Sequence, residues 1–216
     1  MNKIKVAFLV FVMSSLLDII GIIFSIQILI YIFKPLIIFS LVFLYVFSLP
    51  KRLKWYVIAL EFSFFGDVFL LFEGELFFIL GLISFLLAHL LFIKIVIDRI
   101  EKNNLKTMLV SSFPFLIIFG LLMFTLLDSL NELLIPVIIY GLVISIFGTV
   151  ALIDYIQTKS KTALFMLLGA VIFIISDTTL AINKFYSPSH FFEILVMVTY
   201  VLAQYFIFRS MVLSKK

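Results

Sequence analysis

The residues of this sequence that could perform acid–base chemistry lie within long apolar segments rather than in polar loops. Three aspartates, Asp18, Asp67 and Asp177, and one histidine, His89, interrupt runs of Leu, Ile, Val and Phe. An ionisable side chain inside a bilayer costs upward of about 2.5 kcal/mol, so such residues are candidates for function. Two carboxyl groups in a cavity of low dielectric constant can divide the roles of proton donor and stabilising carboxylate. The sequence therefore predicts general acid–base chemistry, with Asp67 and Asp177 as the pair.

Further polar side chains in the same segments could bind a substrate. With a rise of about 1.5 Å per residue and a hydrocarbon layer of about 30 Å, their depths can be compared. The residues expected between the middle of the membrane and its outer surface are Asp18, Lys34, Asp67, Tyr140, Asp177 and Tyr200. His89 and Gln204 are expected deeper, toward the cytoplasmic half. Helices bundled with these side chains inward would enclose one polar cavity. The expected substrate-binding residues are Lys34, Tyr140, Ser176, Asn183, Tyr200 and Gln204.

Most of these residues also have a structural interpretation. Lys34 could extend its ammonium group to the outer interface. Asp18 lies near the end of its segment, where a solvated or capping role is possible. His89 could be a hydrogen-bond partner between helices, and the two tyrosines could simply pack with a satisfied hydroxyl. Asp67 and Asp177 are the hardest to explain as purely structural.

The composition of the chain places these residues inside a membrane protein. Hydrophobic residues make up 65% of the 216 residues and charged residues 13%, and the mean hydropathy is +1.33. A soluble domain is about 45–50% apolar and about 25% charged, so the excess apolar surface must face lipid. A spanning helix needs about 20 apolar residues. The sequence predicts an all-α polytopic membrane helix bundle, a single transmembrane domain over 1–216 with eight spans near 6–24, 28–49, 55–72, 76–97, 105–127, 133–153, 162–182 and 191–213.

The basic residues indicate on which side of the membrane each loop lies. Lys and Arg accumulate in cytoplasmic loops, and eight spans with both termini inside account for 14 of the 16 basic residues. Acidic residues such as Glu73, Glu75 and Asp128 gather in the opposite loops. Only Lys34 and Lys184 depart from the pattern. The sequence therefore predicts an arrangement with the N-terminus and the C-terminus both inside.

The boundary between the first two spans is marked only by Ser25 and Gln27. One long kinked span over this region is the alternative interpretation. It would give seven spans and place Lys3 and Lys5 outside, against the distribution of the other basic residues. We therefore favour two separate spans.

The motifs of several other classes of protein are absent from the sequence. The chain has no cysteine, which excludes a disulfide framework, a thiol nucleophile and a thiolate metal site. It has no GxSxG, no Gly-rich phosphate loop and no HExxH. Its two histidines, His89 and His190, exclude a three-histidine zinc site, and one His with two Asp is a weak metal proposal. We expect no cofactor, and the net charge of +4 does not suggest nucleic acid because the basic residues lie in short loops.

Five segments of the chain form a combination that is more specific than any one of them. They are Lys34–Leu36, Phe62–Leu71, Phe78–His89, Gly169–Asp177 and Thr199–Gln204. In this order and spacing they resemble the lysoplasmalogenase family, also called YhhN-like membrane proteins. That family is described as having eight helices. One position differs, because Val201 follows Thr199 and Tyr200 where the family commonly has Thr-Tyr-Tyr.

The resemblance implies an ether-bond hydrolase that acts on a lysophospholipid within the lipid bilayer. The reaction would be hydrolysis of the vinyl ether of a lysoplasmalogen to a fatty aldehyde and glycerophosphoethanolamine or glycerophosphocholine. The catalytic residues would be Asp67, Asp177 and His89, with His89 relaying a proton or orienting water. We expect the cytoplasmic membrane of a bacterium as its location, with an endoplasmic reticulum membrane as the alternative. The sequence predicts no particular protein partner.

Two other classes of membrane protein fit the buried Asp, Lys and His residues. One is a small-solute or proton-coupled transporter, although the sequence lacks clear pairs of Gly- or Pro-broken helices. Pro35 and Pro136 come nearest to such a pair. The other is a non-catalytic protein that binds lysolipid and releases no aldehyde. Accumulation of unchanged substrate, or binding without reaction, would distinguish them from a hydrolase.

Overall fold

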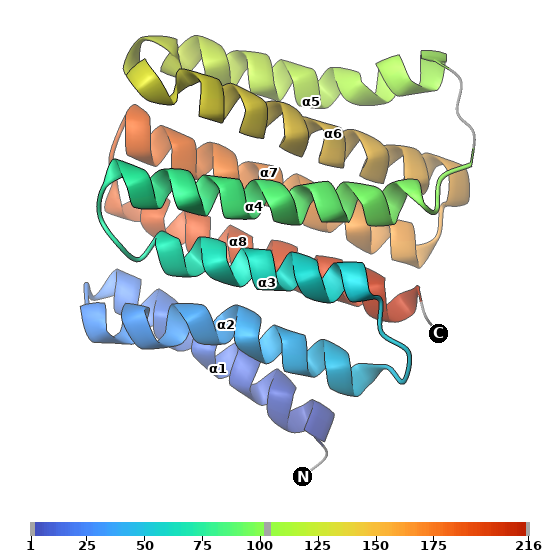
Figure 1. The fold of residues 1–216 in the computed structure, drawn as a ribbon, viewed down its shortest axis with the longest axis horizontal. Coiled ribbons are helices and arrows are strands. Elements are labelled where there is room, and N and C mark those ends of the chain that lie inside the picture. Colours follow the sequence, from blue (N-terminus) through green and yellow to red (C-terminus); the bar gives the residue numbers. More distant parts are fainter. Residues whose placement is uncertain (1–2, 102–104, 215–216) are drawn as a thin grey trace. The chain divides into compact units, whose positions relative to one another are not determined.

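The computed structural model describes residues 3–101 and 105–214, and these residues form eight α-helices (Figure 1). Lys102, Lys215 and Lys216, which contribute to the charge pattern, lie outside the described residues. The prediction of an all-α fold is confirmed, and two short 3-10 turns lie between α5 and α6. The helices are α1 (Lys3–Ile23), α2 (Gln27–Ser48), α3 (Lys54–Phe69), α4 (Glu75–Ile97), α5 (Leu105–Leu126), α6 (Leu134–Thr158), α7 (Lys161–Phe185) and α8 (His190–Leu213).

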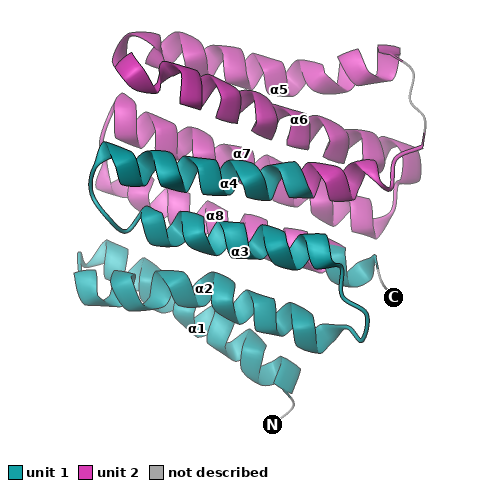
Figure 2. Cartoon of the chain, viewed as in Figure 1, with its two compact units in different colours: residues 1–91, 211–216 teal, residues 92–210 magenta. Residues whose placement is uncertain are grey.

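The described chain divides into two compact units, coloured separately in Figure 2. The first unit contains residues 3–91 and 211–214, and within it α1 packs along α2, and α2 against α3. The second unit contains residues 92–101 and 105–210, and within it α6 lies between α5 and α7. The expectation of a single transmembrane domain stays a prediction.

Seven of the eight helices are long and apolar enough to cross a membrane. The exception is α3, which has 16 residues and is therefore about 24 Å long, short of a hydrocarbon layer of about 30 Å. The helix ends at Phe69, three residues before the end of the span predicted at 55–72, which stays a prediction. Tight turns through Phe72 and a positive φ of 112° at Gly74 reverse the chain there.

The chain between α1 and α2 ends one helix and starts another, so the alternative of one long kinked span is wrong. Ser25 has a left-handed φ of 55°. The N–H of Ile26 donates to the carbonyl of Gly21 at 2.7 Å, and the N–H of Ser25 donates to that of Ile22 at 3.0 Å. This pair of bonds is a Schellman motif, which satisfies the last carbonyls of a helix.

In the second unit, α6 continues to Thr158, five residues beyond the end of the span predicted at 133–153. Asp154, which directly follows the predicted span, is buried and belongs to the helix. The helix stops at Lys159, whose φ is 46°, and the hydroxyl of Ser160 then accepts a hydrogen bond from the N–H of Ala163 at the start of α7. A side-chain cap of this kind satisfies one of the free donors of a helix N-terminus.

The Schellman motif gives a test of the α1–α2 turn. Substitution Ser25→Gly removes the penalty for a left-handed backbone without removing either hydrogen bond, and should stabilise the protein by about 0.5–1 kcal/mol. Thermal unfolding in detergent measures the change. A lowered midpoint would contradict the turn geometry.

Candidate functional site

Asp177, the acid predicted on α7, is held by a tyrosine of the neighbouring helix α6. The hydroxyl of Tyr140 donates to Oδ2 of Asp177 at 2.5 Å. Tyr140 is buried and Asp177 is half-buried. The bond fixes the orientation of the carboxyl group. It engages Oδ2 and does not involve the other carboxyl oxygen, Oδ1. The sequence placed these two residues at the same depth, and the structure brings them together.

Ser176, next to Asp177, joins α7 to α8. Most buried hydroxyl groups of this chain donate to a carbonyl one turn earlier in their own helix, as Ser63 does to Ala59 and Ser145 to Gly141. Ser176 instead donates to the carbonyl of Val196 at 2.9 Å. Its hydroxyl hydrogen is therefore used in a bond between α7 and α8, and the expected contact of Ser176 with substrate stays a prediction.

Tyr200 and Gln204 occupy successive turns of α8. The ring of Tyr200 meets that of Phe173 on α7 edge to face, with centroids 5.6 Å apart. Nε2 of Gln204 lies 3.5 Å from the hydroxyl of Tyr200, a long hydrogen bond. Gln204 is 0% exposed, and its Oε1 has no hydrogen-bond partner among the described residues. A buried amide oxygen of this kind can accept a further hydrogen bond.

The contact between α7 and α8 depends on Gly169. A Cβ atom at this position would lie 2.6 Å from Cγ1 of Ile207 and 3.1 Å from the carbonyl oxygen of Ala203. One of the two obstacles is backbone, so a larger residue would separate the helices. Gly169 thereby sets the distance at which α8 presents Tyr200 and Gln204.

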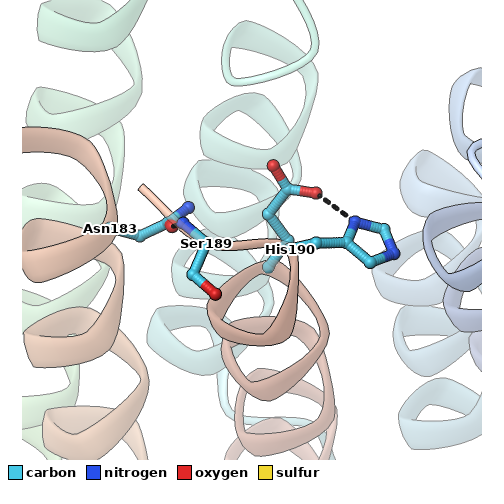
Figure 3. A network of polar contacts seen from close by, with 4 residues as sticks. Asn183, Ser189 and His190 are labelled. Carbon is cyan, nitrogen blue, oxygen red and sulfur yellow. Dashed lines mark hydrogen bonds and ion pairs between the residues drawn. The ribbon is translucent and has the colours of Figure 1, made fainter. Parts of the chain in front are cut away.

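Asn183, another predicted substrate-binding residue, has a hydrogen-bond partner in the next loop, and its role toward substrate stays a prediction. Its Oδ1 accepts a hydrogen bond of 2.7 Å from the N–H of Ser189 in the loop between α7 and α8 (Figure 3). His190 follows this loop at the exposed start of α8, and its Nδ1 lies 3.2 Å from Oε2 of Glu193. These contacts order the loop.

In the first unit, Asp67 lies where α3 and α4 approach closely. Asp67 is buried, and a Cβ atom on the preceding Gly66 would lie 2.6 Å from the ring of Phe85. Phe85 also accepts, through its carbonyl, a hydrogen bond of 2.8 Å from Nδ1 of the buried His89. Because Nδ1 carries the proton in that bond, Nε2 of a neutral His89 has the lone pair. His89 can therefore accept a proton or a hydrogen bond at Nε2.

Lys34 and Asp18 belong to the hairpin of α1 and α2. Lys34 is half-buried on α2, directly before Pro35. A proline cannot donate the usual helical bond to the carbonyl four residues earlier, here that of Tyr31. Asp18 on α1 is fully buried and interacts electrostatically with Lys34. A position near the helix end therefore does not leave Asp18 solvated.

One buried acid was not expected as a site residue. Asp154 lies on α6, has Arg99 as an electrostatic neighbour, and is as well buried as Asp67. Arg99 also approaches Ser210 on α8 at 3.4 Å, and Gln157 exchanges hydrogen bonds with the backbone of Glu101. Asp154 precedes Thr158 by one helical turn. This spacing can be recognised in the sequence only if the helix is taken to continue to Thr158. The cluster fastens the chain after α4 to α6 and α8.

The structure thus joins Tyr140, Asp177, Ser176, Tyr200 and Gln204 through contacts within the second unit. Asp67, His89 and Lys34 lie in the first unit. A single polar layer containing all of them stays a prediction. Among the described residues, no group of three or more His, Cys, Asp or Glu side chains could hold a metal ion.

The apolar helices and the acids buried within them define an integral membrane protein of the helix-bundle class. The family model of the YhhN family matches residues 29–211, and the chain belongs to this family. No solved structure matches the chain.

Two curated relatives carry the same name. Lysoplasmalogenase TMEM86A of Homo sapiens is 28% identical over 171 residues, and that of Bos taurus is 27% identical over 171 residues. In both cases the match covers 74% of this chain and 65% of the relative. The chain therefore spans somewhat less than two thirds of the length of the curated relatives it matches.

The close approach of α7 and α8 can be tested with a matched pair of glycine substitutions. Gly169→Ala should destabilise the protein by about 1–3 kcal/mol, because Ile207 and the backbone at Ala203 must move. Gly120→Ala on α5 meets nothing within 4 Å and should be neutral or stabilising by up to about 1 kcal/mol. Thermal unfolding of both variants in the same detergent decides, and equal shifts would contradict the packing.

Proposed function

We propose that this protein is a membrane hydrolase of the lysoplasmalogenase type, which cleaves the vinyl-ether bond of a lysophospholipid. The observation that carries the proposal is the carboxyl group of Asp177, held by Tyr140 within apolar helices. Membership of the YhhN family and the names of the two mammalian relatives support the same activity.

The chemistry requires an acid, a carboxylate and one water molecule. Protonation of the β-carbon of the vinyl ether gives an oxocarbenium ion, and water adds to its carbon. Loss of a proton yields a hemiacetal, which breaks its bond to the glycerol oxygen and releases an aldehyde and an alcohol. One water is consumed and no oxidant or reductant is needed. A carboxylic acid can supply the first proton, while a carboxylate stabilises the cation and accepts a proton from water.

Asp177 and Asp67 supply the two carboxyl groups in this proposal. The bond from Tyr140 to Oδ2 of Asp177 leaves Oδ1 to exchange a proton with the reacting atoms. Asp67 is buried. The neighbouring Gly66 packs closely against the ring of Phe85, and this contact restricts the position of the backbone at Asp67. His89, with its proton on Nδ1, offers Nε2 to orient or deprotonate the water.

The substrate would be held by one cationic group and by neutral hydrogen-bonding groups. We assign the phosphate to the ammonium group of Lys34, since a phosphate is the only anion of the lysolipid. Oε1 of Gln204 would accept a hydrogen bond from the free hydroxyl of the glycerol. The hydroxyl of Tyr200 is the third group in the set.

We also propose that all eight helices span the membrane, with both termini in the cytoplasm. The short α3 could span if its flanking turns are included or the bilayer is locally thin. Trp55, exposed at the start of α3, and Tyr186, exposed after α7, are suited to the membrane–water interfaces. The compact loops suit the cytoplasmic membrane of a bacterium.

The structure of α2 and α6, which contain Pro35 and Pro136, gives little support to a transporter. Transporter sites are typically formed by helices that are unwound near the middle of the membrane. In the described chain α2 is continuous through Pro35, and Pro136 lies in the first turn of α6. Neither helix therefore shows the break that such a site uses.

Neutral substitutions of the two acids test the mechanism. Asp67→Asn and Asp177→Asn should each lower aldehyde release from a lysoplasmalogen by about 10²–10⁴-fold, because each removes a proton-transfer group. Tyr140→Phe should lower it by about 10–100-fold, the cost of losing a hydrogen bond to a carboxyl group. An aldehyde trap and purified protein in detergent provide the measurement.

Exposed residues of the same types are the controls. Asp128→Asn and Tyr186→Phe should leave aldehyde release within about twofold of the unsubstituted protein. Retained activity in both Asp67→Asn and Asp177→Asn would refute the mechanism. Uptake of unchanged solute into proteoliposomes would favour a transporter, and binding of lysolipid without aldehyde would favour a non-catalytic protein.

The absence of cysteine from the sequence allows the orientation to be mapped directly. Single substitutions Asp128→Cys and Ser187→Cys, in exposed connections, should react with an impermeant maleimide in intact cells. Lys51→Cys and Lys159→Cys should react only after permeabilisation. Labelling of all four from one side would be incompatible with the proposed spans.

A further inference from the structure

Asp18 is a buried acid that the proposed mechanism does not use. Its side chain is 0% exposed, and neither of its carboxyl oxygens has a hydrogen-bond partner among the described residues. A buried carboxyl group in apolar surroundings costs several kcal/mol unless it has a compensating partner. The family match begins at residue 29, so α1 and Asp18 lie outside it.

The register of the α1–α2 hairpin places Asp18 opposite Lys34. The two helices pack along each other and are joined by the short turn at 24–26 (Figure 1). A Cβ atom on Gly21 would lie 2.9 Å from Cβ of Leu29 and 3.2 Å from the backbone nitrogen of Ile30, so this is the point of closest approach. Asp18 lies three residues before Gly21, and Lys34 four residues after Ile30. At about 1.5 Å per residue, both lie about 5 Å from that point, in the same direction.

The polar face of α1 is directed at α2. The buried residues of α1 recur every three or four positions, and include Ser14, Asp18 and Gly21. Ser15 donates to the carbonyl of Phe11 at 2.8 Å, within its own helix. The positive charge that acts on Asp18 is that of Lys34. Two opposite charges at one depth on adjacent helices attract strongly where the surroundings are apolar.

We propose that Asp18 is the counterion of Lys34 and positions its ammonium group to bind the substrate phosphate. The role of the phosphate rests on the proposed function, whereas the charge pair itself does not. Asp18 is a positioning residue, since it acts on the substrate through Lys34. Because Lys34 is half-buried while Asp18 is fully buried, the carboxylate lies behind the ammonium group and leaves part of it accessible to an anion.

A stability cycle tests the charge pair without reference to activity. Lys34→Met leaves a buried carboxylate without its counterion and should lower the thermal midpoint by about 5 °C or more. Adding Asp18→Asn to Lys34→Met should restore most of the loss. Lys184→Met, at the other lysine that departs from the charge pattern, is the matched control and should not be rescued by Asp18→Asn. Failure of Asp18→Asn to rescue Lys34→Met would overturn the charge pair.

A kinetic comparison tests the positioning role. Asp18→Asn should raise KM for a lysoplasmalogen about tenfold with kcat within about twofold, and should have no further effect on KM in the Lys34→Met background. For a 1-alkenylglycerol, which has the vinyl ether but no phosphate, Asp18→Asn should leave KM unchanged. An equal change for both substrates would overturn the positioning role and indicate a general effect on the fold. A rescued stability cycle in a protein that releases no aldehyde would retain the charge pair and refute the proposed function.

Discussion

Lipid offers no hydrogen bonds, so every polar group of a spanning helix must be satisfied by the protein or remain costly. The backbone meets this constraint by forming helices, and most buried hydroxyl groups meet it by donating to a carbonyl one turn earlier. Ser63 and Ser145 are of this kind and therefore say little about function. The groups that remain after this local satisfaction are few, and they are the ones that determine how helices are joined.

The bonds between helices are concentrated around Asp177. Tyr140 of α6 donates to its carboxyl group, and the adjacent Ser176 donates to the backbone of α8. Gly169 allows α7 and α8 to approach closely two turns earlier. The three contacts hold Asp177 of α7 relative to α6 and α8. The proposed proton transfer to a carbon atom would require such positioning.

In the proposed charge pair of α1 and α2, a buried acid would serve a site without touching its substrate. Asp18 has no hydrogen bond among the described residues, yet it faces the helix that carries Lys34. An unpaired lysine in this position would extend toward the water interface, because its long side chain allows this. In the proposed pair, the carboxylate of Asp18 would oppose that movement. The first helix, although outside the family match, would then contribute to binding the lipid phosphate.

The sequence by itself determined the helical fold, the ends of most helices and the acids within predicted spans at Asp18, Asp67 and Asp177, because apolar length and isolated polar residues are local properties of a chain. It also identified the break at Ser25, although only the structure showed the Schellman motif that forms it. Which side chains meet was decided by the tertiary structure. Asn183 bonds to Ser189, and Asp154, which directly follows the predicted span at 133–153, lies buried near Arg99. The reason is that helices apolar on all sides have no polar face from which their rotation can be read. Their rotation is set by close contacts such as those at Gly21 and Gly169, which exist only after the helices have packed.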